Sequence, residues 1–308
     1  MIKKPNEMNF ADKNIVMILT GMPGVGKTTL ALSAPDVLLI DTDDGMCRVN
    51  PEHRKDSSII KTYEELLSDV AAAEGHYKTI AIDTGGALID LMKDWAVRTD
   101  PKASKANGGI SQSGFGIVKL EFLRLFSDLR KKFNVVLIFH ETKTKDGEDT
   151  FFDIMCEGSA KSLVWMPADL GAHVFIMNGK RYMSFGPSEN FNTKAAYGFH
   201  GIVEIPELKK GEPNTFLTRI FEQIRANLKA ESEGAAKDGE KYAEAIKRGK
   251  EIIELVKAPE DVPNALTAIE AVEHALTSKK EITDMLKKKM AELGIVYDKA
   301  SKSYKVKE

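Results

Sequence analysis

Between residues 15 and 225, short apolar runs alternate with segments that have helical spacing. The runs IVMILTG, VLLIDTD, SSIIKT, KTIAIDT and NVVLIFHE are rich in β-branched residues, which is typical of strands buried on both faces. Helices are predicted between them at residues 28–33, 63–74, 87–97 and 117–133. This alternation predicts an α/β fold with a mainly parallel sheet flanked by helices.

The pattern changes after NVVLIFHE. Asn178 and Gly179 separate two β-rich runs and predict a hairpin, and GIVEIP predicts one more strand. From about residue 227 the chain is rich in Lys, Glu and Ala with helical spacing, interrupted by Pro259 and Pro263. The final GIVYDKASKSYKV is compatible with a short hairpin. We therefore expect a core over residues 1–228 and a small, mainly helical appendage over 229–308.

Composition narrows the class of protein. The 308 residues are 43% hydrophobic and 29% charged with a formal net charge of -2, so contact with a polyanion must come from local patches. Cys47 and Cys156 lack CxxC spacing, and the six histidines show no ligand spacing, so neither a disulfide nor structural zinc is expected. The first residues lack the apolar core of a signal peptide, and no apolar run reaches about 18 residues. We expect a cytoplasmic protein without a membrane partner.

The sequence GMPGVGKT matches the phosphate-binding pattern GxxxxGK[ST] at every fixed position. Glycines let successive N–H groups turn toward phosphate oxygens, the Lys27 ammonium reaches the β- and γ-phosphates, and the Thr28 hydroxyl is placed to bind Mg²⁺. A predicted strand precedes the loop and an apolar helix follows it. The predicted nucleotide-binding residues are Gly21, Met22, Pro23, Gly24, Val25, Gly26, Lys27, Thr28 and Thr29.

Carboxylates follow two of the predicted strands. Asp83 ends KTIAIDT, where it would hold Mg²⁺ through water; the alternative is a turn or a helix cap. Many triphosphatases place Glu next, but here Thr84 follows. VLLIDTDDGM brings Asp43 and Asp44 to the same edge, and either could activate the attacking water, Asp43 being the first choice. The alternative is a solvated acidic turn.

Two further polar residues, His140 and Glu141, end the apolar strand NVVLIFHE. If this strand lies between those that carry the phosphate loop and Asp83, both residues would lie beside the γ-phosphate. They could then sense whether that phosphate is present. The alternative is that they are hydrogen-bonded structural residues.

The series GMPGVGKTT, LLIDTDD, IAIDT and VVLIFHETKT resembles the RecA-like P-loop NTPase core over about residues 12–225. More closely, it is similar to phage-encoded, core-only RecA-like ATPases of the Sak single-strand-annealing type. The resemblance implies ATP rather than GTP, with Mg²⁺, and a catalytic carboxylate at Asp43, where the family usually has Glu. It also implies that His140 and Glu141 form the polar strand-end pair, where Gln is more usual.

The resemblance further implies two loops that bind single-stranded DNA, at residues 99–116 and 143–161. The first begins after Arg98 and carries Lys102 and Lys105, and the second offers basic residues around two aromatics, which suit a flexible strand: Lys143, Lys145, Lys161, Phe151 and Phe152. The alternative is mobile surface loops with the phenylalanines in the core. The family's active site lies between subunits, and Lys180 or Arg181 could supply a cation to a neighbour.

Our first functional hypothesis is a phage DNA recombination protein that binds and slowly hydrolyses ATP and promotes annealing or strand exchange. It would form a homo-oligomer, as a ring or filament, and hydrolysis would be stimulated by single-stranded DNA. A single-strand DNA-binding protein is a further candidate partner, and the host cytoplasm the expected location. One alternative is a helicase or loader-type DNA motor. The other is a nucleotide-gated adaptor that does not catalyse.

Overall fold

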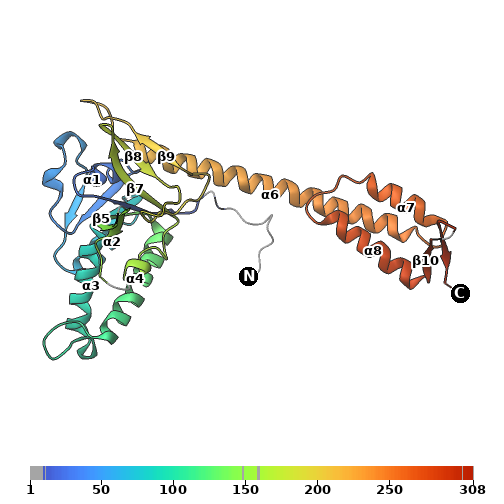
Figure 1. The fold of residues 1–308 in the computed structure, drawn as a ribbon, viewed down its shortest axis with the longest axis horizontal. Helices are drawn as coiled ribbons and strands as arrows, with labels where there is room; N and C mark the ends of the chain where they lie inside the picture. Colours follow the sequence, from blue (N-terminus) through green and yellow to red (C-terminus); the bar gives the residue numbers. More distant parts are fainter. Residues whose placement is uncertain (1–9, 11, 148, 158–159, 300, 308) are drawn as a thin grey trace. The chain divides into compact units, whose positions relative to one another are not determined.

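The computed structural model describes residues 10, 12–147, 149–157, 160–299 and 301–307. The chain divides into two compact units. One is Asp12–Asn227, called here the core unit, and the other comprises Met1–Ala11 with Leu228–Glu308, called here the C-terminal unit. Figure 1 shows the sheet within the core unit and the helices α7 and α8 within the C-terminal unit.

The core unit is built on a mainly parallel sheet with the strand order β3-β2-β4-β5-β1-β7-β8-β9, and β6 pairs with β5. The pairs from β3 to β7 along this order are parallel, whereas β7–β8, β8–β9 and β5–β6 are antiparallel. The predicted α/β class is therefore confirmed. The strands are β1 Val16–Gly21, β2 Val37–Asp41, β3 Ser57–Ile59, β4 Thr79–Asp83, β5 Asn134–Asp146, β6 Asp149–Ile154, β7 Leu170–Met177, β8 Lys180–Ser184 and β9 Ile202–Ile205.

Helices flank this sheet and cover its apolar residues. Thr62 and Glu65 form a capping box at the start of one helix, and Thr84 and Ser111 cap two others. Their apolar faces bury a cluster that includes Phe122, Phe126 and Phe139. The α-helices are α1 Lys27–Ala31, α2 Tyr63–Ala73, α3 Gly85–Thr99, α4 Gln112–Lys132 and α5 Ala160–Leu163, and the short 3-10 turns are η2 Met46–Arg48, η3 Pro51–His53 and η4 Pro101–Ala103.

Both regions predicted as loops contain regular structure. Residues 99–116 include η4 and the first turn of α4, which begins five residues earlier than the predicted residue 117 because Ser111 caps it. Within 143–161, β5 continues to Asp146 and turns back into β6, with Gly147 at φ +61 in the turn. This hairpin was not predicted because its sequence is rich in charged residues.

In the C-terminal unit, helices α7 Asp261–Glu270 and α8 Ser278–Glu292 precede an antiparallel hairpin of β10 Ile295–Asp298 and β11 Ser303–Val306. A single helix, α6 Phe216–Glu254, runs across the expected boundary at residues 228 and 229. Gly249 allows its backbone to approach α8, because a Cβ there would lie 2.5 Å from Ile282 Cγ1. Among the described helices, none is long and apolar enough to cross a membrane.

Candidate nucleotide-binding site

The sheet order brings the predicted site residues to one edge. β5 lies between β1 and β4. In the register of the parallel pairs, Gly21 lies opposite His140, and Asp83 lies opposite both Ile138 and Asp41. The ends of β1, β2 and β4 therefore meet beside His140 of β5 at the carboxyl edge of the sheet, which is where open α/β sheets bind ligands.

The phosphate loop has a backbone that only glycine tolerates well. Gly24 and Gly26 have φ values of +84 and +90. Gly21 has φ +151, and a Cβ there would lie 2.4 Å from the carbonyl oxygen of Val174. Side chains are thus excluded at three positions, which leaves the loop amides accessible to an anion. Met22 and Pro23 complete the loop at its surface, Val25 is buried below it, and Thr29 follows in α1.

Lys27 is folded back onto this loop. Its Nζ donates to the carbonyl oxygens of Gly21 and Met22 at 2.8 and 3.0 Å, and lies 3.2 Å from His140 Nδ1. Burial lowers the pKa of Lys27 to about 8, and the charges of Asp83 and Glu141 oppose this shift. The ammonium group of Lys27 is therefore held in a confined position beside the loop. An anionic ligand there would raise the pKa of Lys27 and favour its charged form.

Thr28 and Asp83 lie together as the magnesium prediction requires. The Thr28 hydroxyl donates to Asp83 Oδ2 at 2.5 Å. Burial raises the pKa of Asp83 to about 6, opposed by the hydrogen bond from Thr28. Over the described residues, no group of three His, Cys, Asp or Glu side chains could hold a metal. A metal here would rely on one hydroxyl, one carboxylate and oxygens of water and phosphate, which fits Mg²⁺.

The acidic residues after β2 divide into different environments. Asp41 is buried and accepts the N–H groups of Gly45 and Met46, each at 2.9 Å, so it shapes the turn. Asp43 is exposed and forms an ion pair with Arg48 at 3.0 Å. Its charge raises the pKa of Asp83, which places Asp43 near the candidate site.

Asp44 differs from its neighbour Asp43. It is exposed with φ +55, and its carbonyl accepts from the Cys47 thiol. No hydrogen bond or ion pair among the described residues joins Asp44 to Lys27, Thr28 or Asp83. Of the two residues, Asp43 is the one whose charge raises the pKa of Asp83.

His140 and Glu141 have different partners. His140 is half-buried beside Lys27, and burial followed by the Lys27 charge lowers its pKa. Glu141 is buried and contacts His173 Nδ1 at 3.0 Å. His173 in turn stacks on Phe191 with ring centroids 4.1 Å apart. Only His140 contacts the phosphate-loop lysine directly, whereas Glu141 affects it through charge.

Sequence reasoning missed two residues that hold this edge together. Thr42 accepts the N–H of Thr84 at 2.7 Å, and its own N–H donates to the Asp83 carbonyl at 2.8 Å. It thereby joins the ends of β2 and β4. His173 is the second, and its only sequence signal is a polar residue within the apolar run LGAHVFIM.

The basic residues of the two predicted DNA-binding regions are partly paired. Arg98 contacts Glu64 at 3.0 Å, and Lys161 contacts Asp153. Phe152 is half-buried, with its ring 5.3 Å from that of His173. The exposed basic residues in these regions include Lys102, Lys143 and Lys145.

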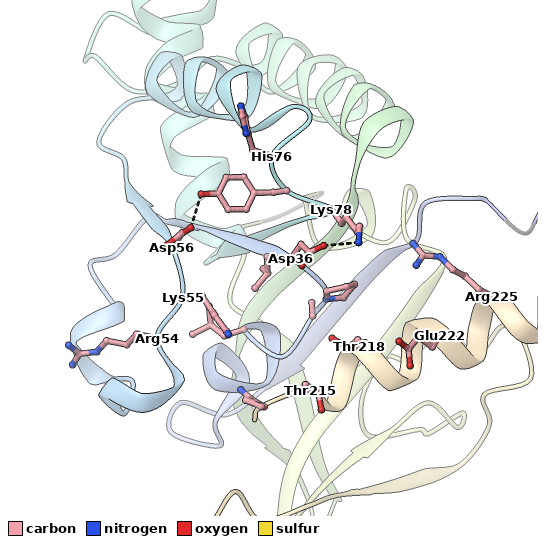
Figure 2. Close-up of a pocket in the computed structure, with 16 residues that line it drawn as sticks. Asp36, Arg54, Lys55, Asp56, His76, Lys78, Thr215, Thr218, Glu222 and Arg225 are labelled. Atoms are coloured by element: carbon pink, nitrogen blue, oxygen red, sulfur yellow. Dashed lines mark hydrogen bonds and ion pairs between the residues drawn. The ribbon is translucent and has the colours of Figure 1, made fainter. Parts of the chain in front are cut away.

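The largest cavity described is not at this edge. An open cleft of about 900 Å³ lies at the opposite edge of the sheet, where residues around the amino ends of β2, β3 and β4 and residues around the start of α6 line it. Two polar contacts lie within it: Lys78 pairs with Asp36 at 2.8 Å (Figure 2), and the Tyr77 hydroxyl donates to Asp56 at 2.9 Å. Cavity size therefore does not indicate where nucleotide chemistry occurs, whereas the phosphate loop does.

The sheet order, the glycine loop and the Thr28–Asp83 pair define a P-loop nucleoside triphosphatase. A family model described as AAA domain matches residues 13–197, which is more than half of the chain. The chain belongs to this family and is an AAA-like P-loop ATPase that binds nucleotide. No curated protein matches it.

Proposed function

We propose that the protein is an ATP-dependent DNA recombination protein. It binds ATP with Mg²⁺, assembles with further copies of itself, and holds single-stranded DNA for annealing or strand exchange. The best support comes from the course of β5. His140 on this strand lies beside Lys27, and the strand then continues into the hairpin that bears Lys143 and Lys145. One strand thus joins the phosphate loop to an exposed basic surface.

The nucleotide chemistry follows from the residues at the edge of the sheet. The loop amides and Lys27 bind the phosphates, and Thr28 with Asp83 would hold Mg²⁺, which neutralises charge that develops on the phosphates. Asp43 orients the attacking water once it leaves its ion pair with Arg48. His140 contacts Lys27 and therefore responds when a phosphate draws the ammonium group away from it.

The DNA-binding part uses the β5–β6 hairpin. Lys143 and Lys145 alternate along β5 and are exposed, so both lie on one side of the strand. Two cations at this spacing bind phosphates without reading base sequence. Because His140 lies on the same strand, nucleotide state and DNA binding are coupled through β5.

The test is phosphate release from ATP, measured with and without a single-stranded oligonucleotide. We expect slow release that the oligonucleotide accelerates, and loss of that acceleration in the Lys143→Ala/Lys145→Ala variant with basal release retained. The matched control is Lys131→Ala/Lys132→Ala, two adjacent lysines just before the amino end of β5. If no nucleotide state of the protein binds the oligonucleotide, the DNA-binding proposal is wrong.

One alternative has a specific observation in its favour. Asp43 is a short carboxylate that already pairs with Arg48, so it is poorly prepared to activate water. A nucleotide-gated adaptor would bind ATP tightly without releasing phosphate, even with DNA present. The same measurement separates the two functions.

A further inference from the structure

Arg181 of β8 lies against the phosphate loop of its own chain. Its Nη1 is 2.8 Å from the position that a Cβ on Gly26 would occupy, and its Cζ is 3.9 Å from that position. The guanidinium group therefore fills the space left by the missing side chain of Gly26. The family resemblance had offered Lys180 or Arg181 as a cation for a neighbouring subunit.

The guanidinium group of Arg181 has no hydrogen-bond acceptor among the residues that the structure describes. Arg181 is half-buried on β8, opposite Ile205 of β9. Within the described part of the chain, it forms no hydrogen bond and no ion pair. The side chains around it come mostly from apolar residues and amides or hydroxyls without charge: Thr29, Leu30, Ile205, Pro206, Asn214 and Phe216.

Lys180, the preceding residue, behaves differently. It is exposed, and its Nζ contacts Glu204 Oε1 at 2.8 Å. Neighbouring residues on a strand point to opposite faces, so only Arg181 faces the loop. A half-buried guanidinium with five donors and no acceptor among the described residues favours binding of an anion, and its planar fork suits phosphate.

We infer that Arg181 acts in cis, as a residue that binds the α- and β-phosphates of the nucleotide held by its own phosphate loop. This inference rests on the proposed nucleotide site. The amides of such loops surround the α- and β-phosphates, whereas the lysine reaches the β- and γ-phosphates. Arg181 lies beside Gly26, so it adds a positive charge to the end of the nucleotide that ADP and ATP share.

The first experiment measures the affinity of the full-length protein for fluorescent ADP and for a non-hydrolysable ATP analogue. Arg181→Ala weakens both by about ten- to a hundredfold, and by the same factor, because the lost contacts are charge-assisted hydrogen bonds to shared phosphates. Arg181→Lys retains the charge but not the fork and has an intermediate affinity. Lys180→Ala leaves both affinities unchanged, and thermal unfolding midpoints establish that each variant is folded.

The second experiment mixes Arg181→Ala with Lys27→Ala and measures phosphate release. If Arg181 acts in cis, the mixture releases no more phosphate than the two variants measured separately, because neither chain has a complete site. Release restored by mixing would show that arginine acts across subunits and would overturn the inference.

Two further results also overturn it: wild-type affinity in Arg181→Ala, or a loss confined to the triphosphate. Failure of the wild-type protein to bind either nucleotide would instead reject the proposed nucleotide function. The two failures are therefore distinguishable.

Discussion

The core unit buries several ionisable side chains, whereas the described ionisable side chains of the C-terminal unit are not buried. In the core unit, the buried ionisable side chains include Lys27, Asp41, Asp83, Glu141 and His173 at the carboxyl edge of the sheet, together with Glu121 of α4 and His53 of η3. Among the described residues of the C-terminal unit, the only buried polar side chain is that of Ser278. Its ion pairs, such as Lys241 with Glu273, lie at the surface.

The difference shows where the chain departs from what stability alone favours. Burying a charge costs free energy unless partners or ligands compensate it. The C-terminal unit avoids this cost through an apolar interior of α6, α7 and α8. The core unit buries Lys27 and Asp83 despite this cost, and burial shifts the pKa values of both groups. Such shifts are typical of functional sites.

The largest expected effect follows from removing the buried ammonium group. Lys27→Ala should weaken the binding of ATP by about a hundredfold or more, because charge-assisted contacts to the phosphates are lost. Equilibrium binding of a fluorescent ATP analogue measures this. Lys131→Ala, which removes an exposed lysine paired with Asp128, is the control and should bind normally. An unaltered affinity in Lys27→Ala would reject the assignment of the loop.

A smaller effect should show whether Asp83 contributes to nucleotide binding through Mg²⁺. Asp83→Asn keeps the size of the side chain and an acceptor for Thr28 but removes the charge. With Mg²⁺ present, ATP affinity should fall by about ten- to a hundredfold, and in a chelator it should equal that of the wild type. Equal losses under both conditions would show that Asp83 has a structural role only.

The two shifted pKa values predict a pH window for binding of the Mg²⁺–nucleotide complex. Asp83, with its pKa of about 6, becomes protonated below that pH and loses its charge for the metal. Lys27, with its pKa of about 8, becomes neutral above that pH. Affinity should therefore be about half its maximum near pH 6 and near pH 8 and fall further outside this range.

Two variants test each side of the pH window. Asp83→Asn should remove the acid limb, and Lys27→Arg, if it still binds, should remove the alkaline limb, because arginine does not titrate there. Titration calorimetry at several pH values measures both. An affinity that is constant across the window and beyond it would contradict the burial of these two charges.

The parts of the site that sequence could predict are those encoded locally. The phosphate loop needs glycines at fixed spacing, and Asp83 ends an apolar strand, so both are visible in short segments. Thr42 and His173 depend on which strands are neighbours in the sheet. A single sequence does not state this order, and the one local signal, the polar His173 within an apolar run, does not indicate what it contacts.

The fold shows the same division between local and distant information. The predicted helices and strands of the core exist because their apolar periodicity is strong, and their order along the chain favours a parallel sheet. Helix α6 was not predicted as one element, since its composition changes along its length while its helical spacing continues. The resemblance offered Lys180 or Arg181 as a cation for a neighbouring subunit, and the closeness of Arg181 to Gly26 was not predicted because it depends on β8 folding back beside β7.

The smallest expected effect on nucleotide binding comes from damaging the C-terminal unit. Ile282 is fully buried against Gly249, and Ile282→Ala should destabilise this unit by about 2–5 kcal/mol through the cavity it leaves. Hydrogen exchange of amides in α8 should accelerate, while nucleotide affinity stays within about twofold, because no buried charge depends on Ile282.

The matched change in the core unit is Ile82→Ala. Ile82 is also fully buried, but it precedes Asp83 on β4, so the same loss of volume should disturb the Thr28–Asp83 pair. Nucleotide affinity should then fall together with the protection of β4 amides. If Ile282→Ala lowered the affinity as much as Ile82→Ala, the two units would not be energetically separate, and the contrast in buried charge would not locate the function.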